Sequence, residues 1–326
     1  GVAVNGSVVT ISAAGEYSVS GTLDNGQIVI NTGDEAMKVT LTLNNASITC
    51  LDAPAIMVEK ADKLKLVLAD GSENTVTSGV EGTAPAADAS GAAIFSKDDL
   101  DIEGSGKLTV NGYINNGIAS KNDLKVQGGY VTVNAVNNGL RGADSVQIEA
   151  GTLVISAGND GIKSATIDKD GKGFITVSGG DVTVSASGDG IDSNGTLTVT
   201  GGITLVAGPT NSGNGAIDYE TSGTVTGGIV IALGASGMAQ GFSAAENQGA
   251  ILCSFSTQSA GQSFCICDAD GTVIASFTAL KSYQSAVITA PGIQSGSTYT
   301  LYSGAVITDA DENGFAQDTT KTGGTV

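Results

Sequence analysis

Two consecutive stretches of equal length decide the fold: GIASKNDLKVQGGYVTVNAVNN at residues 117–138 and GLRGADSVQIEAGTLVISAGND at residues 139–160. Both open with glycine and an aliphatic residue, carry a second glycine near their middle, and end on Asn or Asp. Each contains three short runs in which apolar and polar residues alternate, separated by Gly, Asn or Asp. This pattern is typical of β-strands joined by tight turns.

The same phrase recurs through most of the chain, with a period of about 22 residues, which lies in the range of known repeat proteins. Its opening glycines are Gly117, Gly139, Gly161, Gly190 and Gly215, and the step from Gly161 to Gly190 is the longest. The second glycines are Gly106, Gly129, Gly151, Gly180 and Gly202, and their step from Gly151 to Gly180 is lengthened equally. Because two independent markers share the period and the long step, the chain is a repeat protein with insertions.

Three strands in so short a repeat leave no room for a crossover helix, so the chain must coil. We predict an all-β fold whose main part is a right-handed parallel β-helix of about 22-residue turns. The coil should span residues 1–233 in about ten turns, with looser turns before residue 50 and a long insertion at residues 79–90. Stacked inward positions should form an aliphatic ladder of Ile56, Ile94, Ile118, Leu140, Ile162, Ile191 and Ile217.

The repeat stops after Leu233. We predict a linker at residues 234–249 and an antiparallel β module at residues 250–326, because short alternating runs there are separated by turn residues. An open β-helix end exposes its core and strand edges, so this module should cap it. The polar tail from Asp309 is expected to be mobile.

The composition excludes several classes of function. The chain has 33 acidic and 14 basic residues, a formal net charge of −19, and no histidine. No histidine means no Ser-His-Asp triad and no imidazole metal ligand. The acidic surface argues against a nucleic-acid partner, and no apolar run is long enough for a transmembrane segment. We expect a monomer.

The repeat also stacks outward positions, where chemistry is expected. One column reads Asn116, Asn138, Asp160, Asp189 and Asn214, and a second reads Ala119, Arg141, Lys163, Asp192 and Asp218. Stacked carboxylates repel, so we expect Lys163 to pair with Asp192 and calcium to bind Asp160, Asp189 and Asp192. A solvated Asn/Asp corner with one salt bridge is the alternative. The residues expected to bind a ligand are Lys97, Lys121, Arg141, Lys163 and Asp218.

A second candidate metal site lies in the long turn between Gly161 and Gly190, which carries Asp168-Lys169-Asp170-Gly171. Alternating Asp followed by Gly matches the first half of a calcium loop, so Asp168 and Asp170 are candidate ligands. The closing Glu of such a loop is replaced by Gly179. A polar hairpin is the alternative.

The Asp-Gly-Ile repeats, the Gly-Gly corners, and the phrases at residues 93–100 and 281–285 carry a resemblance. From about residue 15 to 303 the chain resembles the bacterial extracellular carbohydrate-binding β-helix domain family of the clostridial polygalacturonate-binding type. The resemblance implies a pectate-lyase-like shape, bound calcium, and binding of acidic plant polysaccharide without established catalysis. The resemblance implies a functional role only for Asp160, Asp189 and Asp192, which lie in the matching phrase.

Three functions remain open. The first is calcium-assisted, non-catalytic binding of an acidic polysaccharide such as polygalacturonate or pectin, outside the cell or at its surface, with no signal peptide or lipid anchor within this chain. The second is a polysaccharide lyase, for which Lys163 is the candidate base, although neighbouring carboxylates would raise its pKa. The third is a structural surface adhesin or spacer. Since no residue is otherwise suited to catalysis, we expect a protein that is not an enzyme.

Overall fold

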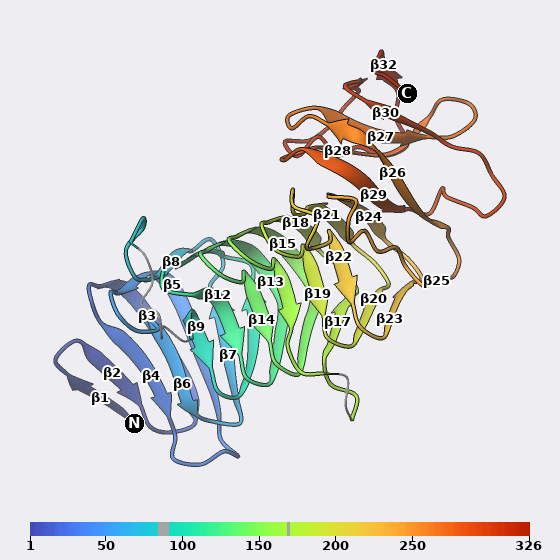
Figure 1. The fold of residues 1–326 in the computed structure, drawn as a ribbon. Coiled ribbons are helices and arrows are strands. Elements are labelled where there is room, and N and C mark those ends of the chain that lie inside the picture. The colour runs from blue at the N-terminus through green and yellow to red at the C-terminus, as the bar shows by residue number, and fades with distance from the viewer. Residues whose placement is uncertain (84–90, 168–169) are drawn as a thin grey trace.

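The structure is a computed structural model, which describes residues 1–83, 91–167 and 170–326. All its regular elements are strands. Within these ranges there is therefore no helix that could span a membrane. The chain coils from its N-terminus along one axis and ends in a separate antiparallel module beside the last turns (Figure 1).

One face of the coil is a sheet of nine parallel strands, which we call the front sheet. In order along the coil they are β2 (Val8–Ile11), β4 (Gln27–Asn31), β6 (Ile56–Lys60), β9 (Ala92–Ser96), β12 (Asn116–Ser120), β14 (Leu140–Gly142), β16 (Ile162–Ser164), β19 (Ile191–Ser193) and β22 (Ile217–Tyr219). Nine equivalent strands define eight complete turns. β1 (Val2–Asn5) precedes them and pairs antiparallel with β2.

The other two faces belong to one large sheet, because three long strands run round the corner between them. These are β5 (Lys38–Cys50), β13 (Asp123–Ala135) and β15 (Ser145–Ala157). One face adds β7 (Lys63–Leu68), β10 (Asp99–Gly104), β17 (Phe174–Val177), β20 (Thr196–Val199) and β23 (Ser222–Val225). The other adds β8 (Glu73–Ser78), β11 (Lys107–Gly112), β18 (Asp181–Ala186), β21 (Ile203–Ala207) and β24 (Ile229–Gly234). β3 (Gly15–Leu23) pairs with β5 at the N-terminal end. The predicted three strands per turn are confirmed.

The glycine markers have a steric cause at the corners. Gly151 has φ +100°, and a Cβ there would lie 2.8 Å from the carbonyl carbon of Gly128 one turn earlier. Gly202 has φ +78°, and its Cβ would lie 2.5 Å from the Gly180 oxygen. Only glycine tolerates both the positive φ and this approach of backbones.

The expected ten turns are too many, because only part of the chain keeps the short period. Turns of 22 residues separate Asn116, Asn138 and Asp160. The next turn, from Asp160 to Asp189, takes 29 residues, and the one after it, to Gly215, takes 26 residues. Nearer the N-terminus the turns are also unequal, and the turn from Ile56 to Ile94 is the longest of all. Insertions at the corners lengthen a turn without changing the ladder.

The inward columns stack as predicted. Each member of the Ile56 to Ile217 ladder pairs in register with the next, and all are fully buried. Val131, Leu153, Val182 and Thr204 form a second column in register. Thr204 interrupts its apolar character, and the hydroxyl finds no hydrogen-bond partner among the described residues.

The C-terminal module packs on the side of the coil. It contains β26 (Ala250–Gln258), β27 (Ser263–Cys267), β28 (Val273–Thr278), β29 (Tyr283–Thr289) and β30 (Thr300–Ser303). β29 pairs antiparallel with both β24 and β26, so the module continues the large sheet. Its apolar residues, such as Phe277, cover the outward side chains of Ile229 and Ile231.

Two expectations about this end of the chain need correction. Residues 234–249 are more than a linker, because Phe242 packs against the coil core and β25 (Ala244–Ala245) pairs parallel with β23. This segment, with Val287 of β29, closes the coil. The tail is tied down: β32 (Lys321–Thr322) pairs with β31 (Val306–Ile307), and Thr319 and Thr325 form further bridges. Backbone pairing replaces the expected mobility.

The register predicts that the same substitution has very different costs at adjacent residues of β13. Val133 lies in the core, whereas Thr132 faces outward. Val133→Asp should lower the free energy of unfolding by at least about 3 kcal/mol, because it buries an unpaired carboxylate. The matched control Thr132→Asp should cost about 1 kcal/mol or less. Urea unfolding measures both, and equal losses would contradict the register.

Candidate functional site

A column of side-chain oxygens runs along one corner of the front sheet. Oδ1 of Asn116 accepts the backbone N–H of Asn138 at 3.2 Å, and Oδ1 of Asn138 accepts that of Asp160 at 3.2 Å. Oδ1 of Asp160 then accepts the N–H of Asp189 at 3.0 Å, and Oδ1 of Asp189 that of Gly215 at 2.6 Å. Over these four steps an Asn or Asp oxygen holds the backbone of the next turn. Gly215 rather than the expected Asn214 ends the column, because this turn has one extra residue.

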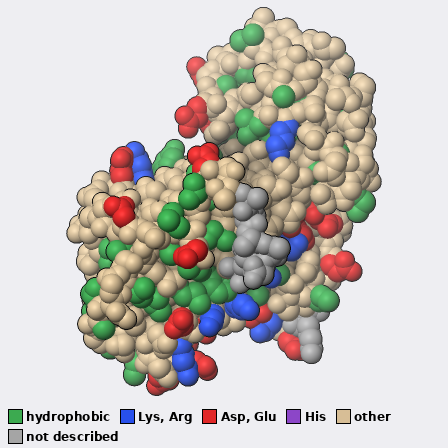
Figure 2. All heavy atoms as spheres, turned by 60° about the vertical axis from the view of Figure 1, so that its left-hand side comes forward, with side chains coloured by type: hydrophobic (Ala, Val, Ile, Leu, Met, Phe, Trp, Pro, Cys, Tyr) green, Lys and Arg blue, Asp and Glu red, His purple; other side chains and the backbone are tan. Residues whose placement is uncertain are grey.

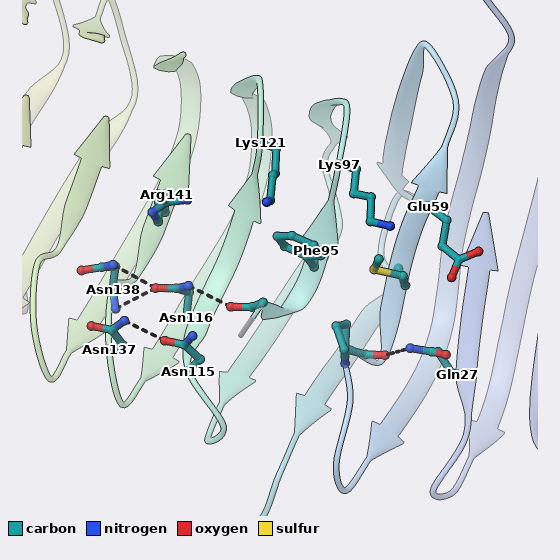
Figure 3. Close-up of a pocket in the computed structure, with 13 residues that line it drawn as sticks. Gln27, Glu59, Phe95, Lys97, Asn115, Asn116, Lys121, Asn137, Asn138 and Arg141 are labelled. Carbon is teal, nitrogen blue, oxygen red and sulfur yellow. Dashed lines mark hydrogen bonds between the residues drawn. The ribbon is translucent and has the colours of Figure 1, made fainter. Parts of the chain in front are cut away.

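Beside this column lies a groove of about 630 Å³ on the outer side of the front sheet, which we call the cationic groove. Lys97 and Lys121 follow directly after β9 and β12, and Arg141 lies within β14 (Figure 3). They therefore occupy three successive turns, spaced by about 4.8 Å. The groove is also lined by Phe95, Asn115, Asn116, Asn137 and Asn138. The structure brings together three of the five residues expected to bind a ligand.

The three cations of this groove differ from the other basic side chains. None of them makes an ion pair or hydrogen bond with a residue that the structure describes. Every other described basic side chain has a partner: Lys38, Lys60, Lys63, Lys65, Lys107, Lys125, Lys163 and Lys172 pair with carboxylates, Lys281 donates to a carbonyl, and Lys321 lies over Tyr302. On the face shown in Figure 2, basic side chains gather in a band beside apolar ones.

The acidic cluster occupies the following turns of the same sheet. One carboxylate oxygen from each of Asp160, Asp189 and Asp192 lies within 4.8 Å of the others. Lys163 lies among them: its Nζ donates to Oδ2 of Asp160 at 2.8 Å and to Oδ2 of Asp192. The predicted Lys163–Asp192 pair is confirmed. Asp218 pairs in register with Asp192 and is half-buried at the far end of this cluster.

Burial and mutual repulsion set the protonation of the cluster. Burial, with the nearby carboxylates of Asp160, Asp192 and Asp218, raises the pKa of Asp189 to about 6. Burial also raises the pKa of Asp192, against the opposing effect of its bond to Lys163. For Lys163, burial acts to lower the pKa, but the hydrogen bonds to two carboxylates outweigh it and the pKa is raised. Lys163 is therefore protonated at neutral pH and poorly suited to act as a base.

The donor set of the cluster fits a hard cation. Carboxylate oxygens are ligands that calcium prefers. Burial raises the pKa of Asp189 most, and a cation would relieve the carboxylate repulsion that adds to this effect. Calcium takes six to eight oxygen ligands, so three carboxylates fill only part of its shell. Lys163 already neutralises Asp160 and Asp192 in part, and would compete with an ion for their oxygens.

Only part of the second candidate metal site lies within the described residues. Asp168 lies outside the described residues, whereas Asp170 is exposed in a turn with φ +58°. Lys172 of the same loop pairs with Asp144 at 2.7 Å. Among the described residues, Asp170 is not part of the group of acids that could hold a metal.

Sequence reasoning missed Phe95 and the amide column of Asn115 and Asn137. Phe95 pairs in register with Met57 and Ala119, so its side chain lies in the same outward column as Arg141. Nδ2 of Asn137 donates to Oδ1 of Asn115 at 2.7 Å. Alignment of the repeats could have identified these residues. It places Asn115 over Asn137, and it extends the outward column that contains Arg141 back to Phe95.

The raised pKa of Asp189 predicts a pH effect in the metal-free protein. Its folded-state pKa of about 6 lies above the ordinary 3.8, so the folded protein holds this proton more tightly. The free energy of unfolding should therefore fall as the pH rises from about 4 to about 6. Asp189→Asn keeps the oxygen that binds Gly215 and removes the charge, so it should be the more stable protein at neutral pH with chelator. Urea unfolding of the natural protein, of Asp189→Asn and of the control Asp24→Asn, which changes an exposed residue, should be measured from about pH 4 to neutral pH. If the free energy of unfolding depended on pH in the same way for all three proteins, the prediction would be wrong.

Comparisons with known proteins agree with this architecture. Residues 5–326 match the model of a family described as carbohydrate-binding domain-containing protein. A curated protein of Acetivibrio thermocellus with that description is 40% identical over 137 residues, covering 41% of this chain and 48% of the relative, so the chain spans about half the length of that relative. The solved polysaccharide lyase-like protein from C. thermocellum, a gadolinium derivative, is 35% identical with a TM-score of 0.63, over 69% of this chain and 90% of that chain. Since the family model spans nearly the whole sequence, the chain belongs to the family of carbohydrate-binding domain-containing proteins.

Proposed function

We propose that the protein binds an acidic polysaccharide of the polygalacturonate type in the cationic groove, without cleaving it and with the assistance of calcium. The observation that carries this proposal is the set of three cations without a partner among the described residues, Lys97, Lys121 and Arg141, on successive turns of one groove. The chain has 33 acidic residues, any of which could have served as an ion-pair partner for these cations. That none of the described residues fills this role favours a ligand that brings its own negative charge.

A linear polyanion matches this arrangement better than a compact anion. The cations lie along the coil axis, and a glycan crossing the strands would present successive uronate groups to them. Each charge-assisted hydrogen bond is modest, but linked contacts add affinity through effective concentration. The amides of Asn115 and Asn137 line the same groove, where the sugar hydroxyls would lie.

The acidic cluster would hold the calcium ion at the end of this groove. Arg141 pairs in register with Lys163, and Lys163 with Asp192, so the two sites are continuous along the front sheet. Asp160, Asp189 and Asp192 would bind the ion, which supplies positive charge where the column becomes acidic. Lys163 and Asp218 flank it as ligand-binding residues. Acidic polysaccharides of this type occur outside the cell, so we propose that the protein acts there or at the cell surface. We also propose that it acts as a monomer.

A lyase is the second candidate, because the solved relative is called polysaccharide lyase-like. β-Elimination needs a neutral base beside the uronate. Lys163 has a raised pKa and donates to two carboxylates, which favours binding over catalysis. Incubation with polygalacturonate separates the two functions, since a lyase would generate the ultraviolet absorbance of unsaturated uronate.

Removal of the groove cations should weaken binding strongly. We expect each of Lys97→Ala, Lys121→Ala and Arg141→Ala to weaken affinity about fivefold, and the triple variant by a hundredfold or so, because charge-assisted contacts are lost. The matched control replaces three paired lysines elsewhere, Lys38, Lys60 and Lys107, with alanine. Electrophoresis through polygalacturonate gels with calcium measures retardation. Equal losses of affinity in both triple variants would show that only net charge matters and not the position of the cations. If the natural protein were not retarded, the assignment of polygalacturonate as the ligand would be wrong.

Calcium should stabilise the folded protein. An ion that binds only the folded state raises the melting temperature by mass action, and chelation should lower it. Asp189→Asn and Asp192→Asn should each diminish this response, whereas Asp24→Asn should keep it. Calorimetry after verified metal removal provides the measurement. A melting temperature that is indifferent to calcium would contradict the metal site and leave the cationic groove as a calcium-independent binding site.

A further inference from the structure

A second groove, of about 380 Å³, lies on the large sheet, where the C-terminal module overhangs the coil. Its floor is formed by outward residues of β13, β15 and β18, including Tyr130, Thr152 and Thr183. Its wall is the loop at residues 311–315 of the C-terminal tail. Figure 1 shows the module above these strands. We call this the overhang groove, and the proposed function does not use it.

The chemistry of the overhang groove is opposite to that of the cationic groove. Asp181, Asp311 and Glu312 line it, and none of its described lining residues is basic. Lys107 pairs in register with Tyr130 on the neighbouring strand, but its ammonium group is held by Glu73 at 2.9 Å. Tyr130 is 48% exposed, so part of its surface is open to a ligand. Carboxylates with an aromatic ring are the combination that recognises an ammonium group.

A largely buried polar residue in the floor gives an independent reason to expect a ligand. Thr183 is only 8% exposed, and no described residue forms a hydrogen bond with its side chain. Val182 and Val184 on either side lie in the coil core, so Thr183 points outward into the groove. Its hydroxyl is therefore available to a molecule in the groove, where a ligand hydroxyl or amine would form a hydrogen bond with it.

The wall of the groove is held in place by the module. Oδ1 of Asp311 accepts the backbone N–H groups of Asn313 and Phe315 at 2.8 and 2.9 Å. The backbone N–H of Thr278 donates to the Asn313 carbonyl at 2.8 Å, and the Ser276 hydroxyl donates to the Gly314 carbonyl at 2.8 Å. A site fixed in this way loses little entropy when it binds.

We propose that the overhang groove binds a protonated amino-sugar unit, as in a deacetylated chitin-type oligosaccharide. The ammonium group pairs with the carboxylates of Asp181 and Glu312 beside the Tyr130 ring. The sugar hydroxyls reach Thr183 and Thr152 in the floor. A protein with this second site could link an acidic glycan on one face to an amino-sugar polymer on another.

Calorimetry with the glucosamine tetramer tests the proposal, with the N-acetylglucosamine tetramer as the neutral probe and spermidine as a polyamine without sugar. We expect the glucosamine tetramer alone to bind measurably at moderate salt. Tyr130→Ala and Asp181→Asn should each weaken it about threefold to fivefold, because one cation contact is removed. Thr183→Val keeps the volume and removes the unpaired hydroxyl, so it should weaken binding without lowering stability.

Controls separate this site from general attraction to an acidic protein. Asp24→Asn removes the same charge from an exposed position outside the overhang groove, and Arg141→Ala alters only the cationic groove. Both should leave glucosamine binding unchanged. Equal binding of spermidine, equal loss in Asp24→Asn, no binding, or preference for the acetylated tetramer would each overturn the proposal. None of these outcomes depends on whether polygalacturonate binds.

Discussion

Parallel pairing of each strand with its equivalent one turn later is the constraint on which the rest of this structure depends. It fixes a spacing of about 4.8 Å between like positions, so a single sequence position becomes a column. Inward columns must then be aliphatic, as in the ladder from Ile56 to Ile217, because one charge there has no compensating partner. Outward columns are free to vary, and function is expected there.

The same constraint explains why acidic residues accumulate where they repel. Asn116, Asn138, Asp160 and Asp189 all hold the backbone of the following turn through one side-chain oxygen. Asn serves as well as Asp in this structural role. The change from Asn to Asp after residue 138 therefore adds charge without need for the fold. Lys163 offsets part of that charge, while burial and then the nearby carboxylates raise the pKa of Asp189.

The fold was predictable from sequence because the period is carried by two independent glycine markers whose steric cause is local. The front-sheet ladder and the Lys163–Asp192 pair followed directly from that period. The number of turns did not, because turns before residue 94 are longer than the assumed period, and the insertion at residues 79–90 was the only one predicted there. Phe242 and the tail could not be placed, since their contacts depend on how the module docks rather than on the repeat. The overhang groove has the same origin: Tyr130 and Asp311 are far apart in sequence and meet only through docking.

Within the cationic groove, the direction of a bound glycan tests the account most directly. A crystal structure with a galacturonate tetramer and calcium would show it. The account predicts a sugar chain that runs along the coil axis across β9, β12 and β14, with carboxylates at Lys97, Lys121 and Arg141 and its end toward Asp189. A tetramer bound along a single strand, or on the large sheet with this groove empty, would contradict the claim that the stacked cations form the binding site.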